Sequence, residues 1–140
     1  MAVYNSISSF NVTFLFDRLD NWKDLKMKAK KHIEFDRVFA YLTDGKTAIL
    51  WFESEDVMRR VGHCMVEMAR GDENLQEDGD VDVSKTYDNA GIRVIINHHS
   101  HCQIILLANE KQMRRAGQCL IDLARIGGNE VEITDEIKDK

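Results

Sequence analysis

The chain of 140 residues contains no proline, only three cysteines and no long apolar run. The lack of proline excludes a long proline-rich linker and lets helices run without interruption. No apolar stretch approaches the ~20 residues that a membrane helix needs, and the N-terminus lacks the pattern of a secretory signal. An odd number of cysteines without such a signal indicates reduced thiols. We therefore expect a cytoplasmic protein that does not bind a membrane.

The chain also lacks a surplus of basic residues, since 19 Lys and Arg against 24 Asp and Glu give a net charge of −5. Nucleic-acid-binding domains usually carry a basic surplus, so this balance disfavours nucleic acid or a nucleotide as the partner. The sequence has no glycine-rich phosphate loop, no nucleophile elbow, no H-E-x-x-H motif and no paired CxxC motif. We expect no enzymatic activity and no cofactor.

An internal repeat is the most informative feature that is present. Residues 58–70 and 113–125 match at seven of thirteen positions when the chain is shifted by 55 residues. Roughly one identity is expected by chance from average composition. The composition, 44% hydrophobic and 31% charged, fits one globular domain over residues 1–140. We interpret the match as a duplication within this domain.

The repeat predicts an α+β fold of two tandem, diverged β-β-α-β units. They form an antiparallel or mixed sheet with the helices packed on one face. The units cover residues 36–90 and 91–140, and the 55-residue offset places 38–41 on 93–96. Residues 1–35 are expected to form a strand near 12–16 and then a basic helix near 21–33. One continuous sheet and two packed halves remain equally open.

Each unit begins with a hairpin. Asp44 and Gly45 are typical central residues of a two-residue type I′ turn, in which both need positive φ. The corresponding turn residues in the second unit are His99 and Ser100. His98 and His101 then flank this turn and face each other across the strands, and His99 points elsewhere.

The repeat helices carry an apolar face that is wider than contact with one sheet requires. A glycine lies in the middle of each helix, at a cost of ~1 kcal/mol relative to alanine. These glycines predict a close approach to the sister helix or to a second copy in a homodimer, or else they make room for a bulky strand residue. The residues of this second stripe are Met58, Gly62, Met65, Met113, Gly117 and Leu120.

Three histidines and a thiol lie close together in the second turn, at His98, His99, His101 and Cys102. Imidazole and thiolate are ligands for zinc or copper. Metal binding here, through His98, His101 and Cys102, is one hypothesis. A polar exposed turn is the other and is favoured, because the first unit has no equivalent residues.

Two arginine pairs recur at the same position of the two helices, Arg59–Arg60 and Arg114–Arg115. Arginine binds phosphate or carboxylate with two parallel hydrogen bonds. The pairs are therefore candidate ligand sites at the repeat interface. The alternative is that they pair with acidic residues one turn away on the same helix.

These observations favour a non-enzymatic binding protein that acts by protein–protein contact, as a regulator or inhibitor of a larger machine. Phage-encoded antagonists of host defence enzymes and toxin-immunity proteins are of this general type. A homodimer is expected, because the second apolar stripe needs cover. The alternatives are a ligand-sensing module that uses the paired arginines and a metal-binding protein that uses the histidine turn.

Overall fold

The computed structural model describes residues 10–14, 26–44, 46–71, 73–89, 91–99, 101–125 and 127–134. Its strands and helices follow in chain order as β1 (Phe10–Phe14), β2 (Lys26–Glu34), β3 (Arg37–Asp44), β4 (Lys46–Phe52), α2 (Glu55–Arg70), β5 (Leu75–Asp78), β6 (Val81–Asp88), β7 (Gly91–His98), β8 (His101–Leu107), α3 (Glu110–Leu123) and β9 (Glu130–Thr134). Neither helix in this part of the chain is long and apolar enough to cross a membrane.

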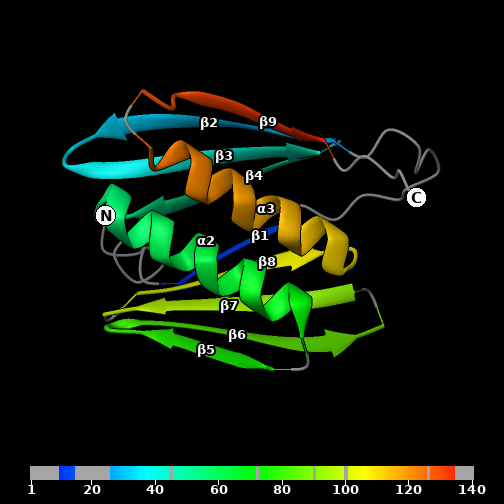
Figure 1. Cartoon of the computed structure of the whole chain (residues 1–140). Coiled ribbons are helices and arrows are strands. Elements are labelled where there is room, and N and C mark those ends of the chain that lie inside the picture. Colours follow the sequence, from blue (N-terminus) through cyan, green and yellow to red (C-terminus); the bar gives the residue numbers. More distant parts are fainter. Residues whose placement is uncertain are drawn as a thin grey trace.

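The fold is α+β, as predicted. The strands form two hydrogen-bonded sheets, ordered β4-β3-β2-β9 and β1-β8-β7-β6-β5. All pairs are antiparallel except β1 with β8. Strand β1, at the edge of the five-stranded sheet, also contacts β4 at the edge of the four-stranded sheet (Figure 1). Both helices lie side by side across the strands in the same view.

The predicted basic helix near 21–33 is wrong where the structure describes it, because residues 26–34 form strand β2. Met27 and Ala29 are buried, whereas Lys26, Lys28 and Lys30, which alternate with them, are exposed. This is the two-residue alternation of a strand with one face on a core. Residues 15–25, including the expected N-terminal part of the helix, lie outside the described residues.

The two hairpin turns differ from each other. The type I′ turn predicted at Asp44 and Gly45 is wrong, because Asp44 pairs with Lys46 and Thr43 with Thr47, so a two-residue loop cannot form. In the second hairpin His98 does pair with His101, which leaves a two-residue turn as predicted. The second hairpin is therefore one residue longer than the first.

This extra residue shifts the alignment of the preceding strands. At an offset of 55 residues the buried Val38 falls on the exposed Arg93, whereas at 54 residues it falls on the buried Ile92. A slip of one residue moves every side chain of a strand to the opposite face, so 54 is the offset that matches β3 with β7. The 38–41 alignment with 93–96 is wrong for this reason.

The helices begin at equivalent caps. The side chain of Ser54 accepts a hydrogen bond from the backbone N–H of Val57, and that of Asn109 accepts one from Gln112. Both satisfy a free donor of the first turn. The helices then pass so close that a Cβ on Gly62 would lie 2.6 Å from the carbonyl oxygen of Gly117.

The second apolar stripe is covered by this helix pair within one chain. Its four large side chains, Met58, Met65, Met113 and Leu120, are completely buried. The stripe therefore offers no surface to a second copy. The homodimer was predicted because this stripe needed cover, and that argument no longer applies.

Two buried lysines tie the ends of the antiparallel helices together. Lys31 of β2 donates to Glu55 at the start of α2 and, at 2.7 Å, to the carbonyl of Leu123 at the end of α3. Lys85 of β6 makes the corresponding contacts with the helices exchanged. It donates to Glu110 at the start of α3 and to the Met68 carbonyl near the end of α2. Each ammonium thus meets a helix C-terminus, where positive charge is favourable.

Candidate functional site

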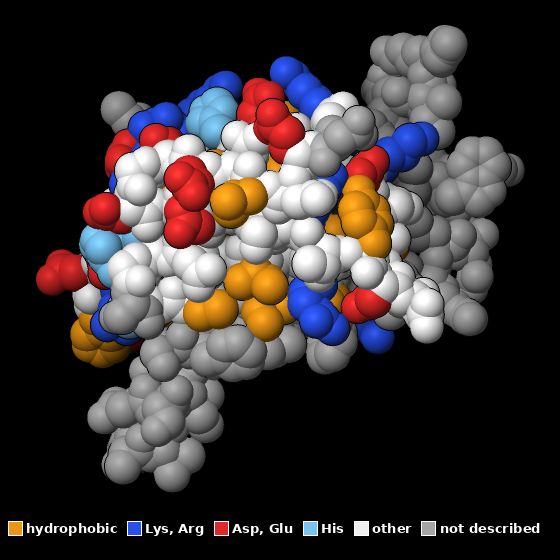
Figure 2. Space-filling model, turned by 90° about the horizontal axis from the view of Figure 1, so that it is seen from below, with side chains coloured by type: hydrophobic (Ala, Val, Ile, Leu, Met, Phe, Trp, Pro, Cys, Tyr) orange, Lys and Arg blue, Asp and Glu red, His pale blue; other side chains and the backbone are white. Residues whose placement is uncertain are grey.

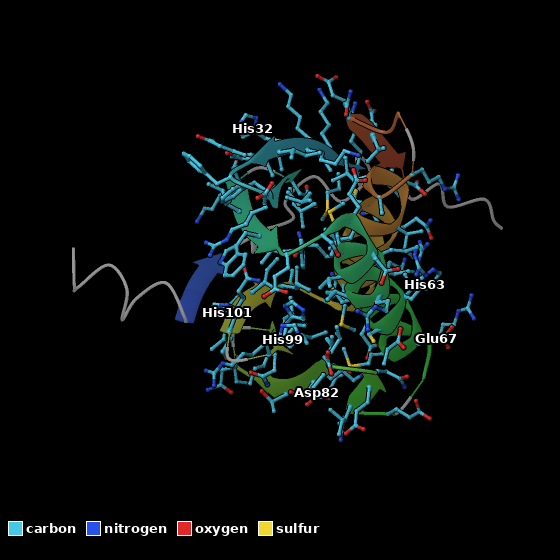
Figure 3. All side chains as sticks on the ribbon, turned by 90° about the vertical axis from the view of Figure 1, so that its left-hand side faces the viewer. His32, His63, Glu67, Asp82, His99 and His101 are labelled. Atoms are coloured by element: carbon cyan, nitrogen blue, oxygen red, sulfur yellow. The ribbon has the colours of Figure 1, made fainter. Side chains whose placement is uncertain are left out.

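Polar side chains from three separate segments meet on the side of the molecule where β4, β5 and β7 end (Figure 1). Glu53 follows β4, Asp80 lies in the turn after β5, and His98 and His99 end β7 and enter its turn. Figure 3 shows His99 beside the five-stranded sheet, with His63 and Glu67 away on the outer side of α2. Figure 2 shows a histidine beside acidic side chains at the left edge of the molecule. We call Glu53, Asp80, His98 and His99 the histidine–carboxylate cluster.

The backbone of His99 explains how two consecutive residues reach one site. Successive side chains of a strand point to opposite faces, so His99 was expected to point away from His98. That expectation is wrong. His99 has a φ of 56°, in the left-handed region, and its ring centroid lies 4.2 Å from that of His98. Left-handed backbone is uncommon outside glycine and is often found at functional sites.

His99 bridges the two carboxylates of the cluster. Its Nδ1 lies 3.2 Å from Glu53 Oε1, and its Nε2 lies 3.0 Å from Asp80 Oδ2. Hydrogen bonds with Glu53 and then with Asp80 raise the pKa of His99 above its usual value. The same bond with His99 lowers the pKa of Glu53, against a smaller opposing effect of burial.

His98 has the opposite character. Only 5% of the residue is exposed, and burial lowers the pKa of its imidazole, which favours the neutral ring. Its Nε2 lies 3.7 Å from Glu53 Oε1, which is longer than a hydrogen bond. The cluster therefore contains a buried imidazole of lowered pKa beside a carboxylate that also contacts a second, exposed imidazole.

The other two residues predicted for this turn, His101 and Cys102, are not part of the cluster. The His101 ring packs edge-on against Trp51 with a centroid distance of 4.6 Å, and Arg37 lies over the same indole. Cys102 is half-buried, and burial raises the pKa of its thiol. Among the described residues, the group close enough to hold a metal ion is Glu53, His98 and His99, so His99 and Glu53 take the places predicted for His101 and Cys102. No sequence motif links Glu53 or Asp80 to this turn.

Arg59, Arg60 and Arg115 each contact an acidic residue of the same chain. Arg59 bonds Asp56 at 2.5 Å, and Arg60 bonds the same carboxylate at 3.1 Å and the Asp78 carbonyl at 2.8 Å. Arg115 is completely buried, with its Nη2 3.5 Å from Asp44 Oδ2.

Arg114 lies half-buried on α3. The arginine positions repeat along the two helices, but Arg60 and Arg115 reach different surroundings. Arg60 contacts the exposed turn after β5, whereas Arg115 lies under the end of β3.

A second unusual feature is the turn between β2 and β3, on the same side of the molecule as the cluster (Figure 1). Glu34 pairs with Arg37, so Phe35 and Asp36 are the central residues of a two-residue turn, with φ of 55° and 61°. Phe35 is 84% exposed, and Ile33 on the preceding strand is 59% exposed. We call Ile33 and Phe35 the apolar hairpin tip.

Comparisons of the chain with protein-family models, with curated proteins and with solved structures find no match. The site must therefore be interpreted from its own geometry.

Proposed function

We propose that the protein is a non-enzymatic cytoplasmic binding protein that regulates or inhibits a larger machine by protein–protein contact. The apolar hairpin tip is the surface that we assign to this contact. The partner that fits it is a folded protein with an apolar pocket that takes the Phe35 ring. Phage-encoded antagonists of host enzymes and toxin-immunity proteins remain the examples of this type.

The observation that carries the proposal is Phe35, which weakens the fold at its position. A residue other than glycine in left-handed backbone costs roughly 1–2 kcal/mol, and type I′ turns normally use asparagine, aspartate or glycine. Burial of the ring does not offset this cost in stability, since 84% of the residue is exposed. Large aromatic side chains dominate the energetics of protein interfaces. A contact with another protein explains why phenylalanine occupies this turn.

We also infer that the two halves are copies of one duplicated unit, and we revise that unit to β-β-β-α-β. Strands β2, β3 and β4, helix α2 and strand β5 have the same order as β6, β7, β8, α3 and β9. The equivalent caps Ser54 and Asn109 and the equivalent lysines Lys31 and Lys85 support this inference. The hairpin tip belongs to the first copy and the histidine–carboxylate cluster centres on the second.

The proposal is tested by substituting the ring while keeping the turn. Asparagine tolerates left-handed backbone, so Phe35→Asn should leave the melting temperature unchanged or higher. If the tip is the contact surface, the same variant should lose most of the partner that the unmodified protein captures from its native cell. The captured proteins are quantified by mass spectrometry.

Leu75→Gln is the matched control. Leu75 is also a large, exposed apolar residue, at 49%, but it lies on the distant edge strand β5. We expect its captured proteins to equal those of the unmodified protein. Equal capture by Phe35→Asn and the unmodified protein would contradict the proposal.

A further inference from the structure

The structure assigns a site for a divalent metal ion of the zinc class to Glu53, His98 and His99. We propose this site in addition to the protein-contact surface, and it does not depend on that surface.

The ligand types fit zinc. Two imidazoles and one carboxylate form a set typical of zinc sites that have three protein ligands and keep a fourth position for water. Calcium and magnesium favour sets made only of oxygen ligands, so the two nitrogens disfavour them.

The distances fit as well. Zinc binds nitrogen and carboxylate oxygen at about 2.0–2.2 Å, so two ligand atoms of a tetrahedral site lie about 3.3–3.6 Å apart. Glu53 Oε1 lies 3.7 Å from His98 Nε2 and 3.2 Å from His99 Nδ1. All three ligand atoms lie within 4.8 Å of one another. The ligand atoms of His98 and His99 are at most 4.8 Å apart, and the exposed side chains of Glu53 and His99 would have to move to bring all three separations into this range.

Asp80 contacts the ring nitrogen of His99 that would not bind the metal, as a carboxylate commonly does at such sites. A histidine that binds metal commonly donates its other ring N–H to a carboxylate, which fixes the tautomer and orients the ring. His99 Nε2 lies 3.0 Å from Asp80 Oδ2 while its Nδ1 faces Glu53. The ring is therefore already oriented with Nδ1 toward the Glu53 carboxylate.

The site would also join the two sheets. Glu53 follows β4, at an edge of the four-stranded sheet, and the histidines end β7 in the middle of the five-stranded sheet. An ion bound between them stabilises the folded state, because it binds ligands that are far apart in the unfolded chain. Metal binding should therefore raise the melting temperature.

The test is titration of the full-length protein, without a histidine tag, with zinc chloride by isothermal calorimetry. We expect one zinc per chain and a higher melting temperature with zinc than with a chelator. His99→Ala and Glu53→Ala change exposed residues and should fold, but each should weaken binding at least tenfold. Asp80→Asn should weaken it by about tenfold, the effect typical of an outer-shell carboxylate.

His32→Ala is the matched control. His32 is an exposed imidazole 3.0 Å from Glu34, but it lies on β2. Its loss should leave zinc binding unchanged. The proposal is overturned if the unmodified protein binds no stoichiometric zinc, or if His99→Ala and Glu53→Ala bind it as tightly as His32→Ala does.

Discussion

At the scale of single residues, the two helix cysteines are inert parts of the core. Cys64 and Cys119 occupy equivalent positions on α2 and α3, and both are buried. Burial raises the pKa of the Cys64 thiol to about 11 and that of Cys119 to about 12. Because the thiolate is the reactive form, neither residue is suited to nucleophilic chemistry at neutral pH.

These raised pKa values predict how stability depends on alkaline pH. Above pH 9 the unfolded chain releases the Cys119 proton, but the folded chain retains it up to about pH 12. The folded state then binds more protons, so the free energy of unfolding falls as the pH rises. Denaturant unfolding of Cys119→Ala between pH 8 and 10.5 should show a slope that is shallower by up to about 1.4 kcal/mol per pH unit. Parallel curves for the two proteins would contradict this prediction.

The histidine turn shows how far sequence reasoning can go at this scale. The run from His98 to Cys102 identifies the turn, and its two-residue length follows from hairpin geometry. The run does not reveal that left-handed backbone at His99 would return its ring to His98. Glu53 and Asp80 are distant in sequence and lie in ordinary polar turns, so only the tertiary fold brings them to the site.

At the scale of elements, the helix pair depends on the two glycines that face each other. Gly62→Ala gains ~1 kcal/mol of helix propensity, but its Cβ would lie 2.6 Å from the Gly117 carbonyl oxygen. Backbone cannot move away as easily as a side chain. We therefore expect the free energy of unfolding to fall by about 1–3 kcal/mol, measured by denaturant unfolding.

Gly71→Ala provides the matched comparison. A Cβ on Gly71 would meet nothing within 4 Å, and its φ is −132°. We expect this substitution to change stability by less than about 0.5 kcal/mol. Equal effects at Gly62 and Gly71 would show that close approach of the helices is not what requires glycine.

Strand β2 explains the main failure of prediction at this scale. The run of lysines favoured a helix, but burial alternates strictly from Lys26 to Lys30. Hydrogen bonds on both sides, to β3 and β9, then fix the strand. The partner β9 lies about 100 residues away in sequence, and no local pattern reveals it.

At the scale of the whole molecule, each half completes the sheet of the other. Strand β5 of the first half pairs with β6, and β9 of the second half pairs with β2. The helices of both halves share one core. The repeat remains a hypothesis drawn from the sequence, and this exchange of strands depends on contacts that a repeat alone does not specify.

The exchange predicts that neither half folds alone. If the chain is divided between Gly79 and Asp80, the first fragment lacks edge strand β9 and the second lacks edge strand β5. Each fragment also lacks the helix that packs against its own. We expect no cooperative unfolding from either fragment by circular dichroism, and its recovery when the two are mixed. A cooperative transition from residues 80–140 alone would contradict a shared core.

The measurement that tests the proposed function most directly is photo-crosslinking from position 35 in the native cell. A photoreactive phenylalanine analogue at Phe35 preserves the ring, and the same analogue at Tyr87 samples another exposed aromatic position at 57% exposure. We predict that position 35 crosslinks to one protein and that position 87 does not. Crosslinks from both positions to the same mixture of abundant proteins, or none from position 35, would contradict contact through the apolar hairpin tip.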